Sequence, residues 1–165
     1  MKFLNKLWKK EPNEDKLREF KCQNFNIILL PHWVELPDDS KDDVGRPVNF
    51  YHSKFENGII QIWTYTFEGN NDFSKAALKR TAIDQLKHKM KSNKIPLKQK
   101  IKQFERDGHF FAETQFKDKG RFWRLLVVVN QKKLAHISYN YRLKHPDVEQ
   151  KEVFRIVESF RFKEI

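Results

Sequence analysis

The residues best suited to bind a partner are lysines that lie close together in the chain. Residues 75–106 contain 11 Lys and Arg side chains against 2 acidic ones, so most of the formal charge of +11 lies in this stretch. A concentrated positive surface is typical of proteins that bind nucleic acids or acidic partners. The candidate partner-binding residues are Lys87, Lys91, Lys94, Lys98, Lys100 and Lys102.

Three interpretations of this basic stretch stay open. The simplest is a solvated face, because lysine is a common surface residue and the chain holds 24 Lys against 9 Arg. Of the two binding interpretations, an acidic protein partner comes before nucleic acid, since arginine is preferred where phosphates are held in a fixed geometry.

Other chemistry finds little support in the residue pattern. The six histidines lack His-x-x-x-His spacing, and the acidic segment from Asp38 to Asp43 lacks the glycine and the terminal Glu of a calcium loop. A single cysteine, Cys22, excludes an internal disulfide. Gly-x-Ser-x-Gly, Gly-x-Gly-x-x-Gly and phosphate-loop motifs do not occur. We therefore expect no metal, no cofactor and no enzymatic activity.

The first ten residues predict a short basic amphipathic helix. Phe3, Leu4, Leu7 and Trp8 share one face and lysines surround it. Docking on the protein's own domain is the favoured interpretation, and weak contact with a membrane surface is the alternative. Lysines interrupt the apolar run that a signal peptide needs, and no apolar stretch approaches the length of a transmembrane helix. We expect a cytoplasmic protein.

Turn signals divide the middle of the chain into strands. Asn57-Gly58 separates two β-prone segments at 48–55 and 59–67, which predicts a hairpin. Asp107-Gly108 and Asp118-Lys-Gly120 separate three further strands, and a fourth follows at 134–143. Shorter strands broken by proline precede the hairpin, within residues 20–36. The segment 122–129 is apolar almost throughout and predicts a central strand covered on both faces.

Two helices are predicted, at 74–91 and 147–160. The first has an apolar stripe of Ala76, Ile83, Leu86 and Met90, into which Lys79 intrudes. The second follows Pro146, and a closing strand at 160–162 comes after it. In the last long strand, Ala135, Ile137, Tyr139 and Tyr141 share one face, with His136 and Ser138 on the other. Together these elements predict an α+β fold with an antiparallel sheet of about six strands.

A chain of 165 residues and 20.0 kDa is the length of one domain. Its aromatic content of 14% argues against intrinsic disorder. We predict an N-terminal extension over residues 1–19 and a single α+β domain over residues 20–165. Trp63, Tyr65 and Phe67 alternate onto one strand face, where packing in the core is favoured over stacking with nucleic-acid bases.

The order of elements resembles the PsbP-like superfamily. The resemblance covers about residues 20–163 and rests on that order, on the Pro31/Trp33 pair within the segment from Phe25 to Glu35, and on the closing segment from Glu158 to Phe162. It implies a three-layer sandwich with helices on both faces of the sheet. It also implies that the protein is an uncharacterised bacterial member of this superfamily and a non-catalytic module that binds another protein.

Three hypotheses follow. The first is a non-enzymatic protein-binding domain of adaptor, accessory or immunity type that uses the basic stretch. The second is binding of nucleic acid or another polyanion through the same lysines, which predicts affinity that falls steeply with salt. The third is a small-ligand-binding protein or hydrolase with a pocket between the sheet and a helix.

Overall fold

A computed structural model describes residues 16–36, 46–54, 58–69, 73–142 and 148–163. The predicted amphipathic helix at residues 1–10 and the acidic segment 38–43 lie outside the described residues. None of the helices in the described part is long and apolar enough to cross a membrane.

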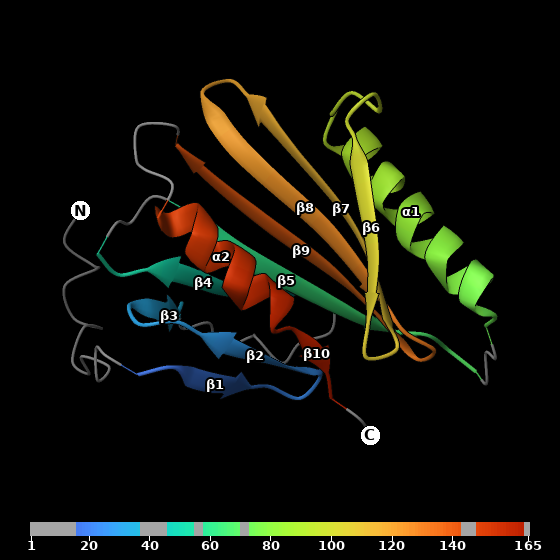
Figure 1. The fold of residues 1–165 in the computed structure, drawn as a ribbon, viewed down its shortest axis with the longest axis horizontal. Coiled ribbons are helices and arrows are strands. Elements are labelled where there is room, and N and C mark those ends of the chain that lie inside the picture. The colour runs from blue at the N-terminus through green and yellow to red at the C-terminus, as the bar shows by residue number, and fades with distance from the viewer. Residues whose placement is uncertain (1–15, 37–45, 55–57, 70–72, 143–147, 164–165) are drawn as a thin grey trace.

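Most of the described strands form one antiparallel sheet (Figure 1). The four-stranded meander is confirmed as consecutive antiparallel pairs, and the predicted hairpin is confirmed as β4–β5. In spatial order, the described strands of this sheet are β3 (Trp33–Glu35), β4 (Val48–His52), β5 (Gly58–Thr66), β9 (Lys133–Arg142), β8 (Arg121–Val129), β7 (His109–Asp118) and β6 (Ile101–Arg106).

Three further strands form a second, smaller sheet. β2 (Phe25–Leu29) pairs with β1 (Arg18–Lys21) on one side and with β10 (Arg161–Phe162) on the other. The sequence predicted one antiparallel sheet of about six strands. The described strands form a main sheet of seven strands and a second sheet of three, which the sequence did not predict. Pro31 and the positive φ of His32, 69°, turn the chain between β2 and β3, so the two strands join different sheets.

Two-residue turns set the register between β6 and β7 and between β7 and β8. Asp107 and Gly108 have φ of 49° and 72°, and Lys119 and Gly120 have φ of 46° and 73°. Positive φ at both central residues matches the right-handed twist of the flanking strands. Gly58 differs from these turn glycines because it is the first residue of β5 and has no positive φ. A Cβ atom there would lie 2.5 Å from the Tyr139 ring and 2.8 Å from the carbonyl oxygen of Asn140.

Alternate residues of the seven-stranded sheet enter two separate cores. Leu125 and Val127 of β8 pack with α1 (Lys75–Ser92), whereas Leu126 and Val128 pack with α2 (Val148–Glu158) and the small sheet. The two helices therefore cover opposite faces of the sheet, which confirms the layered α+β arrangement (Figure 1). The prediction that 122–129 is a central strand is confirmed by the position of β8 between β9 and β7.

The apolar stripe of α1 differs from the predicted one. The buried residues are Leu78, Ala82, Leu86 and Met90, spaced four apart, while Ala76 is exposed and Ile83 is half-buried. The helix begins at Ser74, whose Oγ accepts a hydrogen bond from the backbone N–H of Ala77 at 3.2 Å. Because the stripe is rotated relative to the prediction, Lys79 does not intrude into the core and is exposed.

Candidate functional site

The predicted lysines divide between two regions of the surface. Lys87 and Lys91 lie one turn apart on α1, and Lys94 and Lys98 follow in the loop that leads to β6; all four are exposed. Lys94 has a φ of 57° directly after the end of the helix, where the chain turns back toward the sheet. Along the chain, these four residues form a run of exposed lysines from the C-terminal half of α1 into the loop after it.

Lys102 lies on the other face of the sheet. Neighbouring residues of a strand point to opposite faces, and Ile101 packs in the α1 core whereas Phe104 packs in the α2 core. Lys102 shares its face with Phe104, and therefore points away from the α1 side. Lys100 is exposed just before β6 begins.

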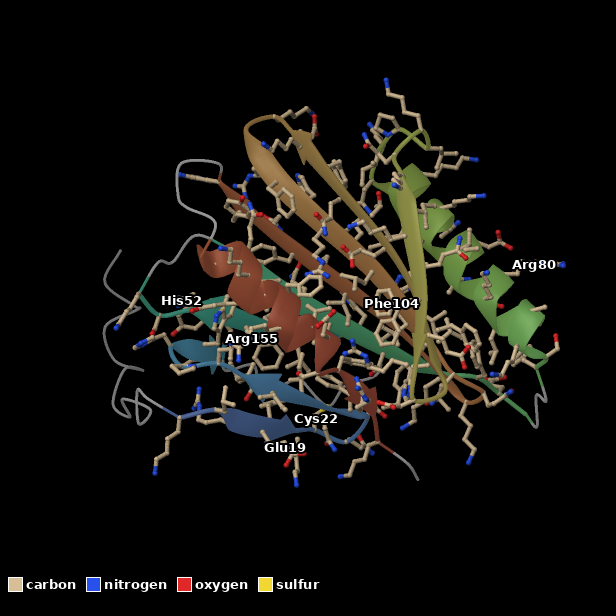
Figure 2. The ribbon with its side chains drawn as sticks, viewed as in Figure 1. Glu19, Cys22, His52, Arg80, Phe104 and Arg155 are labelled. Carbon is tan, nitrogen blue, oxygen red and sulfur yellow. The ribbon has the colours of Figure 1, made fainter. Side chains whose placement is uncertain are left out.

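Two exposed side chains extend the run, and the sequence pattern did not single them out. Arg80 projects from α1 into solvent (Figure 2), and Leu97 is 55% exposed between Lys94 and Lys98. The sequence did contain a signal for Arg80: it lies four and seven positions before Asp84 and Lys87, a spacing that places all three side chains on one face of a helix. We use the name lysine surface for Arg80, Lys87, Lys91, Lys94, Leu97 and Lys98.

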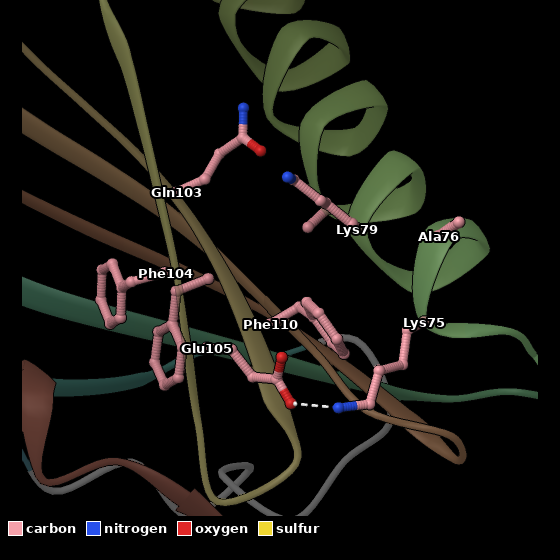
Figure 3. Close-up of a pocket in the computed structure, with 9 residues that line it drawn as sticks. Lys75, Ala76, Lys79, Gln103, Phe104, Glu105 and Phe110 are labelled. Atoms are coloured by element: carbon pink, nitrogen blue, oxygen red, sulfur yellow. Dashed lines mark hydrogen bonds and ion pairs between the residues drawn. The ribbon is translucent and has the colours of Figure 1, made fainter.

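A first pocket lies between α1 and the edge strand β6 (Figure 3). It has a volume of about 270 Å³, and Phe110 lines it. Lys79 and Gln103 extend into it from opposite sides, and Lys75 closes one end through an ion pair with Glu105 at 3.2 Å. Both partners of this ion pair are exposed, so it contributes little stability.

A second pocket of about 370 Å³ lies on the opposite side of the sheet, between α2 and strands β7–β9. We call it the α2 cleft. Its walls combine aromatic rings with basic and amide side chains. The described lining residues are Gln115, Phe122, Arg124, Tyr139, Gln150, Lys151, Val153, Phe154 and Arg155.

One partner of a buried ion pair, Arg124, lines the α2 cleft. Nη2 of Arg124 donates to Oε2 of Glu113 at 2.8 Å, and both side chains are only 3% exposed. The other oxygen of Glu113 accepts a hydrogen bond from the amide of Gln115. Sequence reasoning missed this pair, although a charged residue in each of two largely apolar strands was the signal available. The antiparallel register places Arg124 opposite Gln115, two positions from Glu113.

The Pro31/Trp33 segment is fixed by a buried polar cluster. Trp33 is 0% exposed, and its Nε1–H donates to Oε2 of Glu152 on α2 at 2.9 Å. The same oxygen lies 3.3 Å from Nε2 of His52. Burial lowers the pKa of His52, which Glu152 offsets in part, and Nδ1 accepts a hydrogen bond from the N–H of Lys54. This arrangement attaches β3 and β4 to α2 and explains why the chain has a tryptophan there.

The aromatic residues of β5 lie on the α1 side of the sheet. The ammonium group of Lys89 lies 4.6 Å from the ring centre of Trp63, and Phe67 packs at the margin of the α1 core. Tyr65 is exposed, and its ring meets that of His136 edge to face at 5.7 Å. The prediction that this face packs in the core is therefore wrong for Tyr65, while Trp63 and Phe67 are half-buried and Phe67 packs against the α1 core.

Metal-binding geometry is not found in the part of the chain that the structure describes. No three His, Cys, Asp or Glu side chains come together there in a way that could hold an ion. His136 lies on the α1 side of β9. His109 instead holds the closing strand, since its Nε2 accepts the backbone N–H of Phe162 at 3.3 Å.

Comparison with known proteins shows the fold. No protein-family model and no curated protein sequence matches the chain. Among solved structures, cyanobacterial PsbP (CyanoP) of Synechocystis sp. PCC 6803 superposes with a TM-score of 0.61 at 10% identity, over 90% of this chain and 94% of that one.

Two further structures agree with this assignment. LpqN of Mycobacterium tuberculosis, which is involved in cell envelope biogenesis, gives a TM-score of 0.53 at 10% identity over 90% and 91% of the two chains. A Bacteroides thetaiotaomicron protein gives 0.55 at 14% identity over 85% of this chain, which spans 45% of that protein's length. The chain has a PsbP-like fold, and the resemblance found in the sequence is confirmed at that level.

Proposed function

We propose that this protein is a non-enzymatic binding protein that recognises an acidic protein partner through the lysine surface. The observation that carries the proposal is the charge of the segment 75–100, where nine Lys and Arg side chains face a single acid, Asp84. Opposite charge on a partner accelerates encounter and fixes orientation more than it adds affinity. The PsbP-like fold is compatible with this function.

Leu97 favours a protein over a nucleic acid as the partner. Protein interfaces combine an apolar anchor with a polar rim, and Leu97 is an exposed apolar side chain between two exposed lysines. A phosphate backbone offers nothing for a leucine to bury against, and the lysine surface contains only one arginine, Arg80.

Affinity capture from the native host, with and without nuclease, tests the proposal. The bait is the full chain, compared with a variant that carries Lys87→Glu, Lys91→Glu, Lys94→Glu and Lys98→Glu. We expect one stoichiometric acidic protein that survives nuclease at moderate salt and is lost from the variant. A control with the same change in charge carries glutamate at four exposed lysines elsewhere and should retain the partner; these are Lys16, Lys54, Lys117 and Lys119.

Two outcomes would contradict the proposal. If the charge-reversed variant captures the partner as well as the natural chain does, the lysine surface is not the interface. If the captured proteins are ribosomal or nucleoid proteins that disappear with nuclease, the second hypothesis, polyanion binding, is favoured. Heparin competition and a steep dependence of affinity on salt would then confirm it. A Leu97→Ala variant separates the two hypotheses further, because only a protein interface should weaken.

A further inference from the structure

The α2 cleft lies on the face of the sheet opposite to α1, so it is separate from the lysine surface. Its volume of about 370 Å³ is within the range of small-molecule sites, roughly 300–1,000 Å³. Two strands of the sheet supply Gln115, Phe122 and Arg124, and α2 supplies the facing wall; Figure 2 shows Arg155 on this helix.

The charged side chains that line the α2 cleft are all basic among its described lining residues. Arg124, Lys151 and Arg155 line the cleft together with two glutamine amides, and none of the described lining residues is Asp or Glu. Glu113 does not line it, and each of its oxygens already accepts a hydrogen bond, from Arg124 and from Gln115. An anion in the cleft would therefore meet donors rather than competing acceptors.

Arg124 has hydrogen-bonding capacity left over. Its Nε is buried and has no hydrogen-bond partner among the described residues. A buried donor without a partner is unfavourable, and in native proteins it usually indicates a water, ion or ligand that completes the site. The guanidinium is held in place by Glu113 on one side and by the ring of Phe154, 4.6 Å away, on the other.

The remaining wall of the α2 cleft is aromatic and apolar. Phe122 and Val153 line it, and Phe154 is 44% exposed although it stacks on Arg124. The buried ring of Tyr139 forms the floor, and its hydroxyl donates to Glu149 at 2.8 Å. A ligand that fits must therefore carry an apolar, preferably flat, body as well as a negative charge.

We propose that the α2 cleft binds a small aromatic carboxylate. One carboxylate oxygen accepts the hydrogen bond of Arg124 Nε, the exposed Lys151 and Arg155 attract the charge, and the aromatic body packs against Phe122 and Phe154. A planar carboxylate matches the planar guanidinium better than a tetrahedral anion does, because the two groups can lie in one plane.

Titration of the full chain with 2-naphthoate, followed by NMR, tests the proposal. We expect saturable shifts in the Arg124 Nε–H signal and in the side-chain amides of Gln115 and Gln150. The uncharged 2-naphthamide should bind about 10- to 100-fold more weakly, because it forgoes a charge-assisted hydrogen bond. Inorganic phosphate should also bind weakly, since it has no apolar body. Equal affinity for naphthoate and naphthamide, or the absence of saturable shifts, would overturn the proposal.

Two variants locate the binding. Replacing Arg124 alone would leave the charge of Glu113 buried without its partner. The first variant therefore replaces both residues, as Glu113→Leu/Arg124→Met. Apolar replacement of a whole buried ion pair is often neutral for stability. This variant should lose naphthoate binding and keep a dispersed spectrum. The exposed pair Lys151→Glu/Arg155→Glu should weaken binding without affecting folding. Lys87→Glu/Lys91→Glu, two exposed lysines of α1 on the opposite side of the sheet, serves as the matched control. If both cleft variants bind naphthoate like the natural chain, the site is elsewhere.

Discussion

At the scale of single residues, the structure assigns its buried histidines to packing and hydrogen bonding. Burial, reinforced by nearby Lys89 and His88, lowers the pKa of His136 to about 4. Burial also lowers the pKa of His109 and of His52. In the folded chain, burial therefore favours the neutral form of these rings near pH 7, although Glu152 partly offsets this effect at His52.

His136 predicts that the protein loses stability in mild acid. The unfolded chain binds a proton at this ring near pH 6.5, whereas the folded chain does so only near pH 4. The free energy of unfolding that this difference contributes is fully present above pH 6.5 and decreases as the pH falls to about 4, by about 3 kcal/mol. Urea unfolding between pH 7.5 and 4 measures it. His136→Gln should flatten the curve, and parallel curves for the two proteins would contradict the prediction.

At the scale of secondary structure, α1 is the element on which the proposed interface depends. It carries Arg80, Lys87 and Lys91 outward while Leu78, Ala82, Leu86 and Met90 fix its orientation on the sheet. The helix packs on β7 and β8. Its first turn contains no acidic residue, so Ser74 is important for its N-terminus.

Loss of the Ser74 cap should loosen the start of α1. Ser74→Ala removes the acceptor of the Ala77 N–H, and we expect a loss of about 1 kcal/mol in the free energy of unfolding. Hydrogen exchange should accelerate at Ala77 and Leu78. Ser92→Ala is the matched control, because Ser92 is exposed and its hydroxyl caps no backbone N–H: it donates to the carbonyl of Lys89 and accepts from the side-chain amide of Asn93. Ser74→Asp should restore stability, and equal losses for Ser74→Ala and Ser92→Ala would show that the cap is unimportant.

At the scale of the whole molecule, the sheet separates two surfaces of different chemistry. The α1 side presents lysines around an exposed leucine, and the α2 side presents a smaller cationic cleft with aromatic walls. The lysine surface belongs to α1 and the loop after it, whereas the α2 cleft is formed by β7–β9 and α2 on the other face of the sheet. The two proposals can therefore be tested independently of each other.

This separation predicts that changes on one side leave the other unaffected. The variant with Glu at Lys87, Lys91, Lys94 and Lys98 should bind 2-naphthoate with unchanged affinity at 0.15 M salt, because solvent screens charges beyond a Debye length of about 8 Å. Conversely, Glu113→Leu/Arg124→Met should retain the captured protein partner. Calorimetric titration of naphthoate into both variants checks this prediction. A loss of naphthoate affinity in the lysine variant would show that the two surfaces are coupled.

The sequence by itself determined the local features of the protein. Turn residues and β-prone runs located the hairpin and the meander, and apolar periodicity located both helices. These signals can be read from the sequence because dihedral preferences and hydrophobic periodicity act between near neighbours in the chain. The surplus of lysine at 75–106 was visible for the same reason. The element order, together with the Pro31/Trp33 pair and the closing segment from Glu158 to Phe162, then suggested a PsbP-like fold.

Tertiary structure alone decided which residues meet. Strand pairing placed Arg124 and Glu113, eleven positions apart, in one buried ion pair and divided the strands between two sheets. The orientation of α1 chose Leu78 and Ala82 for the core in place of Ala76, and the pleat of β6 sent Lys102 to the face opposite α1. Such outcomes depend on contacts between distant segments, and local periodicity contains no information about which segments those will be.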